Sequence, residues 1–289
     1  MSAFKVRFWG TRGSIPAPGA KTQRYGGNTS CVELRHARGV FILDAGTGIR
    51  ELGDQLVAES MGRPVRAHLF ITHTPWDHVQ GFPFFFPIYA KENGFWIYGP
   101  RGIGKGFEEN FRGLMDFDYF PVGLSDVSAE LRFKELQAEP FEIEGVAVRA
   151  AYTNHPGMDL AYRFSLGGRS VTYLTDHEPY QTMNGVSELT RRQDRAIEDF
   201  CRGSDLLICD GQYTERQYRA RKGWGHSRYT DTVQLAVSAG VLRLAISHHD
   251  PSHTDEQLDA IAEDCRRILK RSGSSMDCIM AGDGLDVEI

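Results

Sequence analysis

Residues Thr72–Gly81 read THTPWDHVQG and come directly after the largely apolar run Ala67–Ile71. An apolar run of this length predicts a buried strand, so the stretch lies where a strand ends and a helix begins. His73, Asp77 and His78 fall within six residues of one another in this stretch. Imidazole nitrogens and a carboxylate are the ligands that zinc and similar divalent metals bind. The stretch therefore predicts a metal-binding loop, although a polar surface turn explains an isolated trio of this kind equally well.

Further polar residues follow predicted strands or stand in glycine-rich turns elsewhere in the chain. In chain order they are His155 in TNHPG, Asp176 in YLTDHEP, Asp210 in DGQY, His226 in GWGHS and His248 in SHHDP. Proteins carry reactive groups on the loops where strands stop, because the strands themselves are buried. The shared location indicates that side chains far apart in the sequence serve one site.

Together these segments resemble the metallo-β-lactamase superfamily of metal-dependent hydrolases. THTPWDH is similar to its His-x-His-x-Asp-His signature, except that Pro75 stands in place of the second histidine. DAGTG, NHPG, YLTDHEP, GHS and SHHDP resemble further segments of the phosphodiesterase branch, which includes tRNA 3′-processing endonucleases and small cyclic-phosphate phosphodiesterases. The opening segments WGTRGSIPAPG and RYGGNTS look closest to a bacterial and archaeal subgroup whose substrates are mostly undefined.

The resemblance implies two metal sites that share one aspartate. The first takes His73, His155 and Asp176, and the second takes Asp77, His78, His248 and the same bridging Asp176. The first site lacks one imidazole, because Pro75 has no donor atom. Losing a ligand costs a few kcal/mol of a total that is roughly 10–16 kcal/mol in structural zinc sites. We therefore expect one tight metal and one weak or empty site, with zinc favoured and manganese or iron possible.

Other residues could support or complete these sites. Asp44 opens DAGTG at the end of a predicted strand, and the resemblance implies that it holds the metal-binding loop in place. A helix-capping aspartate is an equally compatible interpretation of Asp44. His177, His249 and His253 lie near enough in the sequence to replace the imidazole missing at Pro75.

The chemistry expected of such a centre follows from the metal. A bound metal lowers the pKa of its water to about 7, which gives hydroxide at neutral pH, and it polarises a phosphoryl or carbonyl oxygen. The resemblance implies that Asp176 orients this hydroxide. It also implies that His226 donates a proton to the leaving oxygen and that Asp210 orients His226. A structural role for His226 in its glycine-rich turn is the alternative.

These residues predict a metal-dependent hydrolase, and we expect it to be a phosphodiesterase acting on a small nucleotide or cyclic phosphate. A thioester or lactone hydrolase is the first alternative, because the same fold serves acyl chemistry. The second alternative is a metal-poor sensor or binding module in which Pro75 marks a degraded first metal site.

The composition of the chain indicates which binding partners and which cellular compartment to expect. The net charge is −5 and no long basic run is present. A protein that binds nucleic acid through phosphates usually shows a basic footprint, so a large nucleic acid is expected to be an unlikely partner. The five cysteines are scattered, and no signal peptide or membrane-spanning run is found. We expect a cytoplasmic protein with no membrane partner.

The order of predicted elements indicates the fold class. Each half of the chain is rich in strands and closes with helices, which favours an α/β (α+β) protein. We expect a four-layer αββα sandwich of two mixed β-sheets flanked by helices, formed by a single domain spanning residues 1–289. The aromatic stretch Gly81–Gly102, the helix expected at Ile103–Met115 and the residues up to Leu124 should form one wall of the cleft and a possible homodimer contact.

Overall fold

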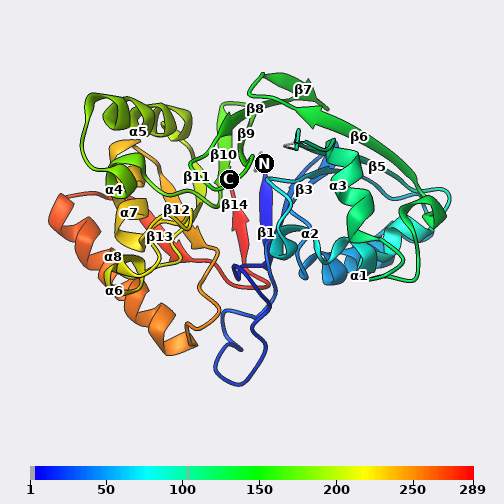
Figure 1. Cartoon of the computed structure of the whole chain (residues 1–289), viewed down its shortest axis with the longest axis horizontal. Helices are drawn as coiled ribbons and strands as arrows, with labels where there is room; N and C mark the ends of the chain where they lie inside the picture. Colours follow the sequence, from blue (N-terminus) through cyan, green and yellow to red (C-terminus); the bar gives the residue numbers. More distant parts are fainter. Residues whose placement is uncertain (1–3, 103) are drawn as a thin grey trace.

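Residues 4–102 and 104–289 are described by a computed structural model, and within them two seven-stranded mixed sheets lie face to face (Figure 1). The first sheet has the order β14-β1-β2-β3-β4-β5-β6 and consists of β1 (Lys5–Gly10), β2 (Cys31–His36), β3 (Gly39–Leu43), β4 (Arg66–Phe70), β5 (Gly94–Pro100), β6 (Glu130–Leu136) and β14 (Asp286–Glu288). The second has the order β13-β12-β11-β10-β9-β8-β7 and consists of β7 (Phe141–Ile143), β8 (Val146–Tyr152), β9 (Leu160–Leu166), β10 (Arg169–Leu174), β11 (Leu206–Asp210), β12 (Arg243–Ser247) and β13 (Asp277–Met280).

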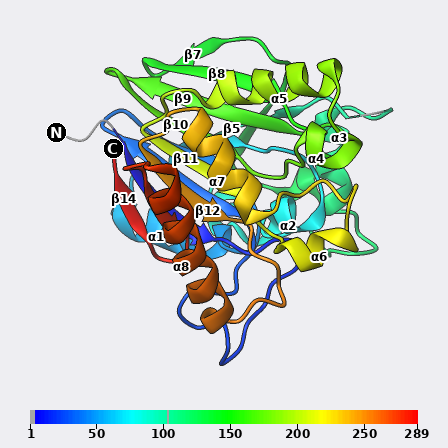
Figure 2. The ribbon, with the colours of Figure 1, turned by 90° about the vertical axis from the view of Figure 1, so that its left-hand side faces the viewer.

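Helices cover the outer faces of both sheets, and Figure 2 shows α5, α7 and α8 over the second sheet. The helices are α1 (Ile49–Ser60), α2 (Trp76–Val79), α3 (Phe107–Leu114), α4 (Tyr180–Asn184), α5 (Glu188–Cys201), α6 (Glu215–Arg219), α7 (Tyr229–Ser238) and α8 (Asp255–Ser272), with short 3-10 turns η1 (Phe82–Phe84), η2 (Phe86–Tyr89) and η3 (Leu124–Asp126). The predicted four-layer fold is confirmed.

The core between the sheets follows from strand periodicity. Phe4, Val6 and Phe8 are fully buried, whereas Lys5 between them is exposed, because successive side chains of a strand point to opposite faces. Phe70 from the first sheet packs edge-on against Phe164 from the second, with ring centroids 5.0 Å apart. Contacts of this kind join the two sheets along the middle of the molecule.

The parallel half of each sheet positions the polar loops. In the first sheet β3, β4, β5 and β6 are parallel, and in the second β10, β11, β12 and β13 are parallel. The carboxyl ends of parallel strands meet at one edge of a sheet, so the loops after β4, β10, β11 and β12 gather at one rim. These loops carry the residues singled out in the sequence.

The aromatic stretch is divided between core and surface. Phe82 and Phe85 are buried under the first sheet's outer face, whereas Phe84 and Phe86 are exposed. The helix expected at Ile103–Met115 is α3, which is shorter, and Ile103 lies outside the described residues. In the part of the chain that the structure describes, no helix combines the length and the apolar character needed to cross a membrane.

Candidate metal centre

Asp176 follows β10 and lies at the middle of a cluster of imidazole rings. The rings with a nitrogen within 3.9 Å of its carboxylate are those of His73, His78, His155, His226 and His248. Burial raises the pKa of Asp176, but the imidazoles of His248 and His78 outweigh burial and hold this pKa well below its usual range. The carboxylate is therefore ionised at any physiological pH.

Three groups of side chains have ligand atoms within 4.8 Å of one another. Two of them contain every candidate metal ligand named from the sequence, namely His73, His155 and Asp176 in one and Asp77, His78 and His248 in the other. The third consists of Asp176, His226 and His248, so the position of His226 is also compatible with a metal ligand.

The group of Asp77, His78 and His248 is firmly held by its surroundings. Nδ1 of His78 lies 2.8 Å from Oδ2 of Asp44, which leaves Nε2 of His78 facing the centre. The backbone N–H of Ser14 donates to Oδ2 of Asp77 at 2.6 Å, and Nε2 of His248 lies 3.2 Å from the same oxygen. Hydrogen bonds of this kind fix the tautomer and the orientation of a ligand.

The backbone of this group is held in an unusual conformation. Asp44 and His248 have φ of 60° and 56°, in the left-handed region that non-glycine residues seldom adopt. Such strain persists where surrounding contacts fix it, and it concentrates at functional sites. Burial lowers the pKa of His78, but the carboxylates of Asp77 and Asp176 outweigh burial and raise this pKa well above its usual value.

The group of His73, His155 and Asp176 has fewer charged neighbours. Nδ1 of His155 donates to the carbonyl of Gly225 at 3.0 Å, so its Nε2 faces Asp176. Burial lowers the pKa of both His73 and His155, which favours their neutral, metal-binding forms. Pro75 caps the short helix α2 with extended backbone and supplies no side-chain donor.

A cavity of about 310 Å³ opens beside this group. It is lined by His73 and Pro75 on one side and by Pro156 after His155 on another. Pro100 and Asn110 complete the wall. The segment after the metal-binding loop thus contributes to the cleft through β5 and α3 rather than through Tyr119 and Phe120, which the structure does not place in the wall.

Asp159, just before β9, is a site residue that the sequence analysis missed. Its Oδ2 accepts a hydrogen bond from Thr153 at 2.5 Å, whereas Oδ1 is buried, has no hydrogen-bond partner and lies 3.5 Å from Nδ1 of His73. Burial, and then the charge of Asp176, raise the pKa of Asp159 to about 7. An aspartate in the segment NHPGMD carries no local signal, because only folding brings it behind His73.

His226 and Asp210 form the pair named from the sequence. Nδ1 of His226 lies 3.1 Å from Oδ2 of Asp210, and the backbone N–H of Gln212 donates to the other oxygen at 2.7 Å. Burial lowers the pKa of His226, but Asp210 and then Asp176 outweigh burial and raise it to about 9. Nδ1 also lies 3.9 Å from Oδ2 of Asp176, so the same edge of the ring faces both carboxylates, and the raised pKa favours the protonated ring.

The three histidines considered as replacements for the missing imidazole have other partners. Nδ1 of His177 accepts from the backbone N–H of Asn154, Nε2 of His249 donates to the carbonyl of Ala281, and His253 contacts Gln217. Among the described residues, none of the three belongs to a group of potential metal ligands. This arrangement does not support replacement of the missing imidazole by any of the three.

The side chains present fit a divalent cation. Nε2 of His73 is buried without a hydrogen-bond partner, and Nε2 of His78 faces Nε2 of His248 at 3.2 Å. Two buried carboxylates, Asp77 and Asp176, face the same space. Unpaired nitrogens and carboxylates that converge in a buried space are the donor set that zinc, manganese and iron bind.

Comparison with known proteins agrees with this geometry. The family described as "Beta-lactamase superfamily domain" matches residues 40–249. The chain belongs to the metallo-β-lactamase superfamily. Its membership and its His/Asp groups identify it as a metal-dependent hydrolase.

Relatives and solved structures match nearly the whole chain. Ribonuclease Z from Methanosarcina acetivorans is 24% identical, over 99% of this chain and 98% of that protein. The metallo-beta-lactamase fold protein YhfI from Bacillus subtilis has a TM-score of 0.71 at 17% identity, with 100% of both chains covered. The short form of human tRNase Z has a TM-score of 0.64 at 20% identity, with 98% of both chains covered. The resemblance to the phosphodiesterase branch is confirmed.

The expectation that a large nucleic acid is an unlikely partner is wrong. It is overturned by full-length relatives that are named ribonuclease Z. The physical reason lies in averaging, because a net charge of −5 sums over the whole chain and says nothing about the charge of one face.

Proposed function

We propose that the chain hydrolyses phosphodiester bonds of nucleotides with the help of a divalent metal. The convergence on Asp176 of imidazoles from separate loops carries this proposal, since His73 and His248 approach it at 3.4 and 3.2 Å. Relatives named ribonuclease Z support phosphodiester rather than acyl chemistry.

The side chains suggest two unequal metal positions. His73, His155 and Asp176 would hold one cation, and Asp77, His78 and His248 with the same Asp176 would hold another. A cation there would activate a water molecule and polarise a phosphoryl oxygen. Zinc is the metal we propose, with manganese and iron as alternatives that imidazole and carboxylate ligands also accept.

His226 is proposed as the general acid. Its Nδ1 is bound to Asp210, so Nε2 carries the proton that can pass to the leaving oxygen. Asp210 keeps the ring in this tautomer and favours its protonated form. The carboxylate of Asp176, whose Oδ2 lies 3.9 Å from Nδ1 of His226, would orient the attacking water.

A small nucleotide or cyclic phosphate is the substrate that the cavity beside His73 suggests. Its volume of about 310 Å³ lies at the lower end of the range of small-molecule sites. A ribonucleic acid strand is the second candidate, supported by the names of the relatives, because one terminal nucleotide of a strand could occupy the same cavity.

Substrate class is tested by comparing bis-p-nitrophenyl phosphate, a cyclic nucleotide, a p-nitrophenyl ester and a thioester, each with zinc, manganese or iron supplied separately. We expect turnover of the two phosphodiesters and much slower turnover of the ester and the thioester. Faster hydrolysis of the thioester than of either phosphodiester would contradict the proposal and favour the acyl alternative.

The His226→Ala variant separates the general acid from a metal ligand. We expect a fall in turnover of about 100-fold, within the usual contribution of acid–base catalysis, with metal content unchanged. Loss of bound metal in parallel with turnover would instead assign His226 to the group that it forms with Asp176 and His248.

We also propose that residues 1–289 form one domain and that two copies associate in the cytoplasm. A core shared by both sheets supports the single domain. Exposed aromatic side chains within the metal-binding loop and the segment that follows it support a subunit contact: Trp76, Phe84, Phe86, Phe117 and Tyr119. Light scattering should give the mass of a dimer, and a monomer at micromolar concentration would contradict this proposal.

A further inference from the structure

The segment from α6 to the histidine of the metal centre has a charge opposite to that of the whole chain. Between Glu215 and Arg228 the sequence ERQYRARKGWGHSR contains one acidic residue and the basic residues Arg216, Arg219, Arg221, Lys222 and Arg228. The net charge of the chain is −5. This segment therefore creates a local positive region beside a centre whose own side chains are rich in carboxylates.

Part of this positive charge is already neutralised. Glu215 binds Arg228 and lies 3.5 Å from Arg219. The guanidinium of Arg221 lies 4.0 Å from a carboxylate oxygen of Asp250, so these three arginines have acidic partners. Arg216 and Lys222 are exposed, and within the described residues neither has a carboxylate oxygen within 4.0 Å. Both side chains are free to meet a ligand.

An exposed indole stands next to these cations. Trp224 is 59% exposed, and the guanidinium of Arg221 lies 6.0 Å from the centre of its ring and 5.3 Å from that of Tyr213. A depression of about 500 Å³ lies between α6 and Trp224 and is lined by Arg216 and Arg221. We call Arg216, Arg221, Lys222 and Trp224 the Trp224 surface.

The Trp224 surface is connected directly to the metal centre. Gly225, the residue after Trp224, accepts a hydrogen bond from His155, and its φ of +89° suits glycine. A Cβ atom at Gly225 would lie 2.2 Å from Nδ1 of His155, so the loop packs against that ring at a distance that only glycine allows. The surface thus begins one residue from the site.

A buried carboxylate fixes this loop in place. Glu178 accepts hydrogen bonds from the backbone N–H of Gly223 at 2.9 Å and of Gly225 at 3.0 Å. It also accepts one from the hydroxyl of Tyr218 in α6 at 2.6 Å. A surface held in this way loses little conformational entropy when a ligand binds.

We propose that the Trp224 surface binds the backbone of a single-stranded nucleic acid whose end enters the metal centre, with one base stacked on Trp224. The proposal rests on the proposed function and extends it from a single nucleotide to a strand. An exposed indole accepts any base, and stacking contributes about 1–3 kcal/mol per base. Unpaired arginine and lysine side chains bind the phosphates and so position the strand without reading its sequence.

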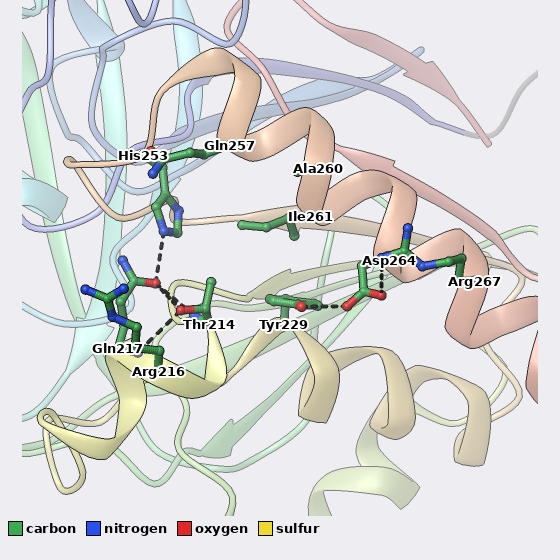
Figure 3. A pocket seen from close by; sticks show the side chains of 10 residues that line it. All are labelled: Thr214, Arg216, Gln217, Tyr229, His253, Gln257, Ala260, Ile261, Asp264 and Arg267. Carbon is green, nitrogen blue, oxygen red and sulfur yellow. Dashed lines mark hydrogen bonds and ion pairs between the residues drawn. The ribbon is translucent and has the colours of Figure 1, made fainter.

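A neighbouring cavity of about 490 Å³ between α6, α7 and α8 is a weaker candidate for such a ligand (Figure 3). Its Arg267 is bound to Asp264, which also accepts a hydrogen bond from Tyr229. The charge of Arg267 is therefore largely neutralised. Arg216, which lines both this cavity and the Trp224 surface, has no such acidic partner among the described residues.

The test measures binding of a fluorescently labelled twelve-nucleotide oligouridylate to the metal-loaded protein by anisotropy at several salt concentrations. We expect the double variant Arg216→Glu/Lys222→Glu to weaken binding at least tenfold. It should also reduce the slope of log affinity against log salt by about 1.4, since each phosphate contact to a single strand contributes about 0.7. Trp224→Ala should weaken binding by about 5-fold to 150-fold.

The matched control is Arg191→Glu/Arg192→Glu, which makes the same change of charge on exposed residues of α5. Figures 1 and 2 show α5 and α6 at opposite ends of the helical layer. Equal weakening by the control and by Arg216→Glu/Lys222→Glu would overturn the proposal. It would also be overturned if the oligonucleotide bound no tighter than uridine monophosphate, or if polyglutamate displaced it as well as unlabelled oligonucleotide does.

Activity measurements distinguish this proposal from the proposed function. In Arg216→Glu/Lys222→Glu, the rate of hydrolysis of bis-p-nitrophenyl phosphate should stay unchanged, while kcat/KM for the oligonucleotide should fall at least tenfold. If the metal-loaded wild-type chain bound the strand but hydrolysed neither compound, the proposed function would be wrong and the binding surface would stand. If both substrates were hydrolysed with no difference between wild type and variant, the binding surface would be wrong.

Discussion

The two halves of the metal centre share Asp176 but differ in charge and in restraint. Around His78, Asp44 fixes the ring and Asp77 adds a second carboxylate, whose oxygen is held by a backbone N–H. Around His73, the potential metal ligands found among residues 4–102 and 104–289 are only His155 and Asp176, and the additional carboxylate, Asp159, lies behind the ring. The affinity of each half for a cation therefore depends on the charges and hydrogen bonds around its ligands as well as on the number of ligands.

The largest effect should come from replacing one histidine in each half. His78→Ala removes the imidazole that lies between the buried carboxylates of Asp77 and Asp176. We therefore expect the affinity for zinc to fall at least 100-fold and turnover to be lost. His73→Ala should lower retention of only the weaker cation, by about tenfold. Zinc content after dialysis and competition with a chromophoric chelator measure both. Equal losses in the two variants would show that the halves do not differ.

The sequence predicts those features of the two halves that depend on a local pattern of residues. The loop after β4 contains three of the polar residues within one short stretch, and the apolar runs before Asp176 and His248 identify strand ends without any structure. Because parallel strands bring such ends together, the convergence of these loops follows from the strand pattern and the fold class.

The remaining features depend on distances that no local pattern encodes. Asp159 matters because its unpartnered oxygen lies behind His73, which is far away in the sequence. Glu178 matters because it holds the loop before His226. The basic charge of residues 216–228 is lost in a net charge of −5, and only the fold shows that the loop they form contacts His155. Packing between separate loops decides each of these roles.

Restoring the missing imidazole should make the halves more alike. Pro75 has φ of −62° and ψ of 157°, a conformation that histidine adopts without strain. We expect Pro75→His to tighten the weaker cation by about 10-fold to 100-fold, measured by chelator competition. Pro75→Ala is the control, because it frees the same backbone N–H without adding a nitrogen ligand. Identical affinities for the two variants would mean that position 75 does not face the metal.

Asp159 offers a smaller change in the same half. Asp159→Asn removes a buried charge, so the unfolding free energy of the metal-free protein should rise by about 1 kcal/mol. Retention of the weaker cation should fall severalfold, because a negative charge behind His73 is lost. Combining the variant with Pro75→His should recover part of the retention. Unchanged retention in Asp159→Asn would leave Asp159 with a purely structural role.

The smallest effect on metal retention is expected for the loop that braces only the other half. The segment after β1 passes His248 so closely that a Cβ atom at Gly13 would lie 2.4 Å from Nδ1 of that ring. Asp283 holds the far end of this loop by accepting a hydrogen bond from the backbone N–H of Asn28 at 3.1 Å. Burial raises the pKa of Asp283 to about 6.

This raised pKa predicts a dependence of stability on pH. The unfolded pKa of an aspartate is about 3.9, so between about pH 4 and pH 6 the folded chain binds more protons at Asp283 than the unfolded chain does. The contribution is therefore fully present below about pH 4 and is lost as the pH rises through 6. Allowing for partial exposure, the loss is on the order of 2 kcal/mol.

Urea unfolding at pH 4.5 and pH 7 isolates this contribution when wild type is compared with Asp283→Asn. The asparagine can still accept the hydrogen bond from Asn28 but does not titrate, so the variant should lose less stability than wild type over the same interval. Asp283 braces the loop beside His248 through its hydrogen bonds with Asn28 and Thr11. Chelator competition should therefore detect a change only in the affinity for the tighter cation. A parallel pH response of the two proteins would mean that Asp283 ionises in the folded chain as it does in the unfolded one.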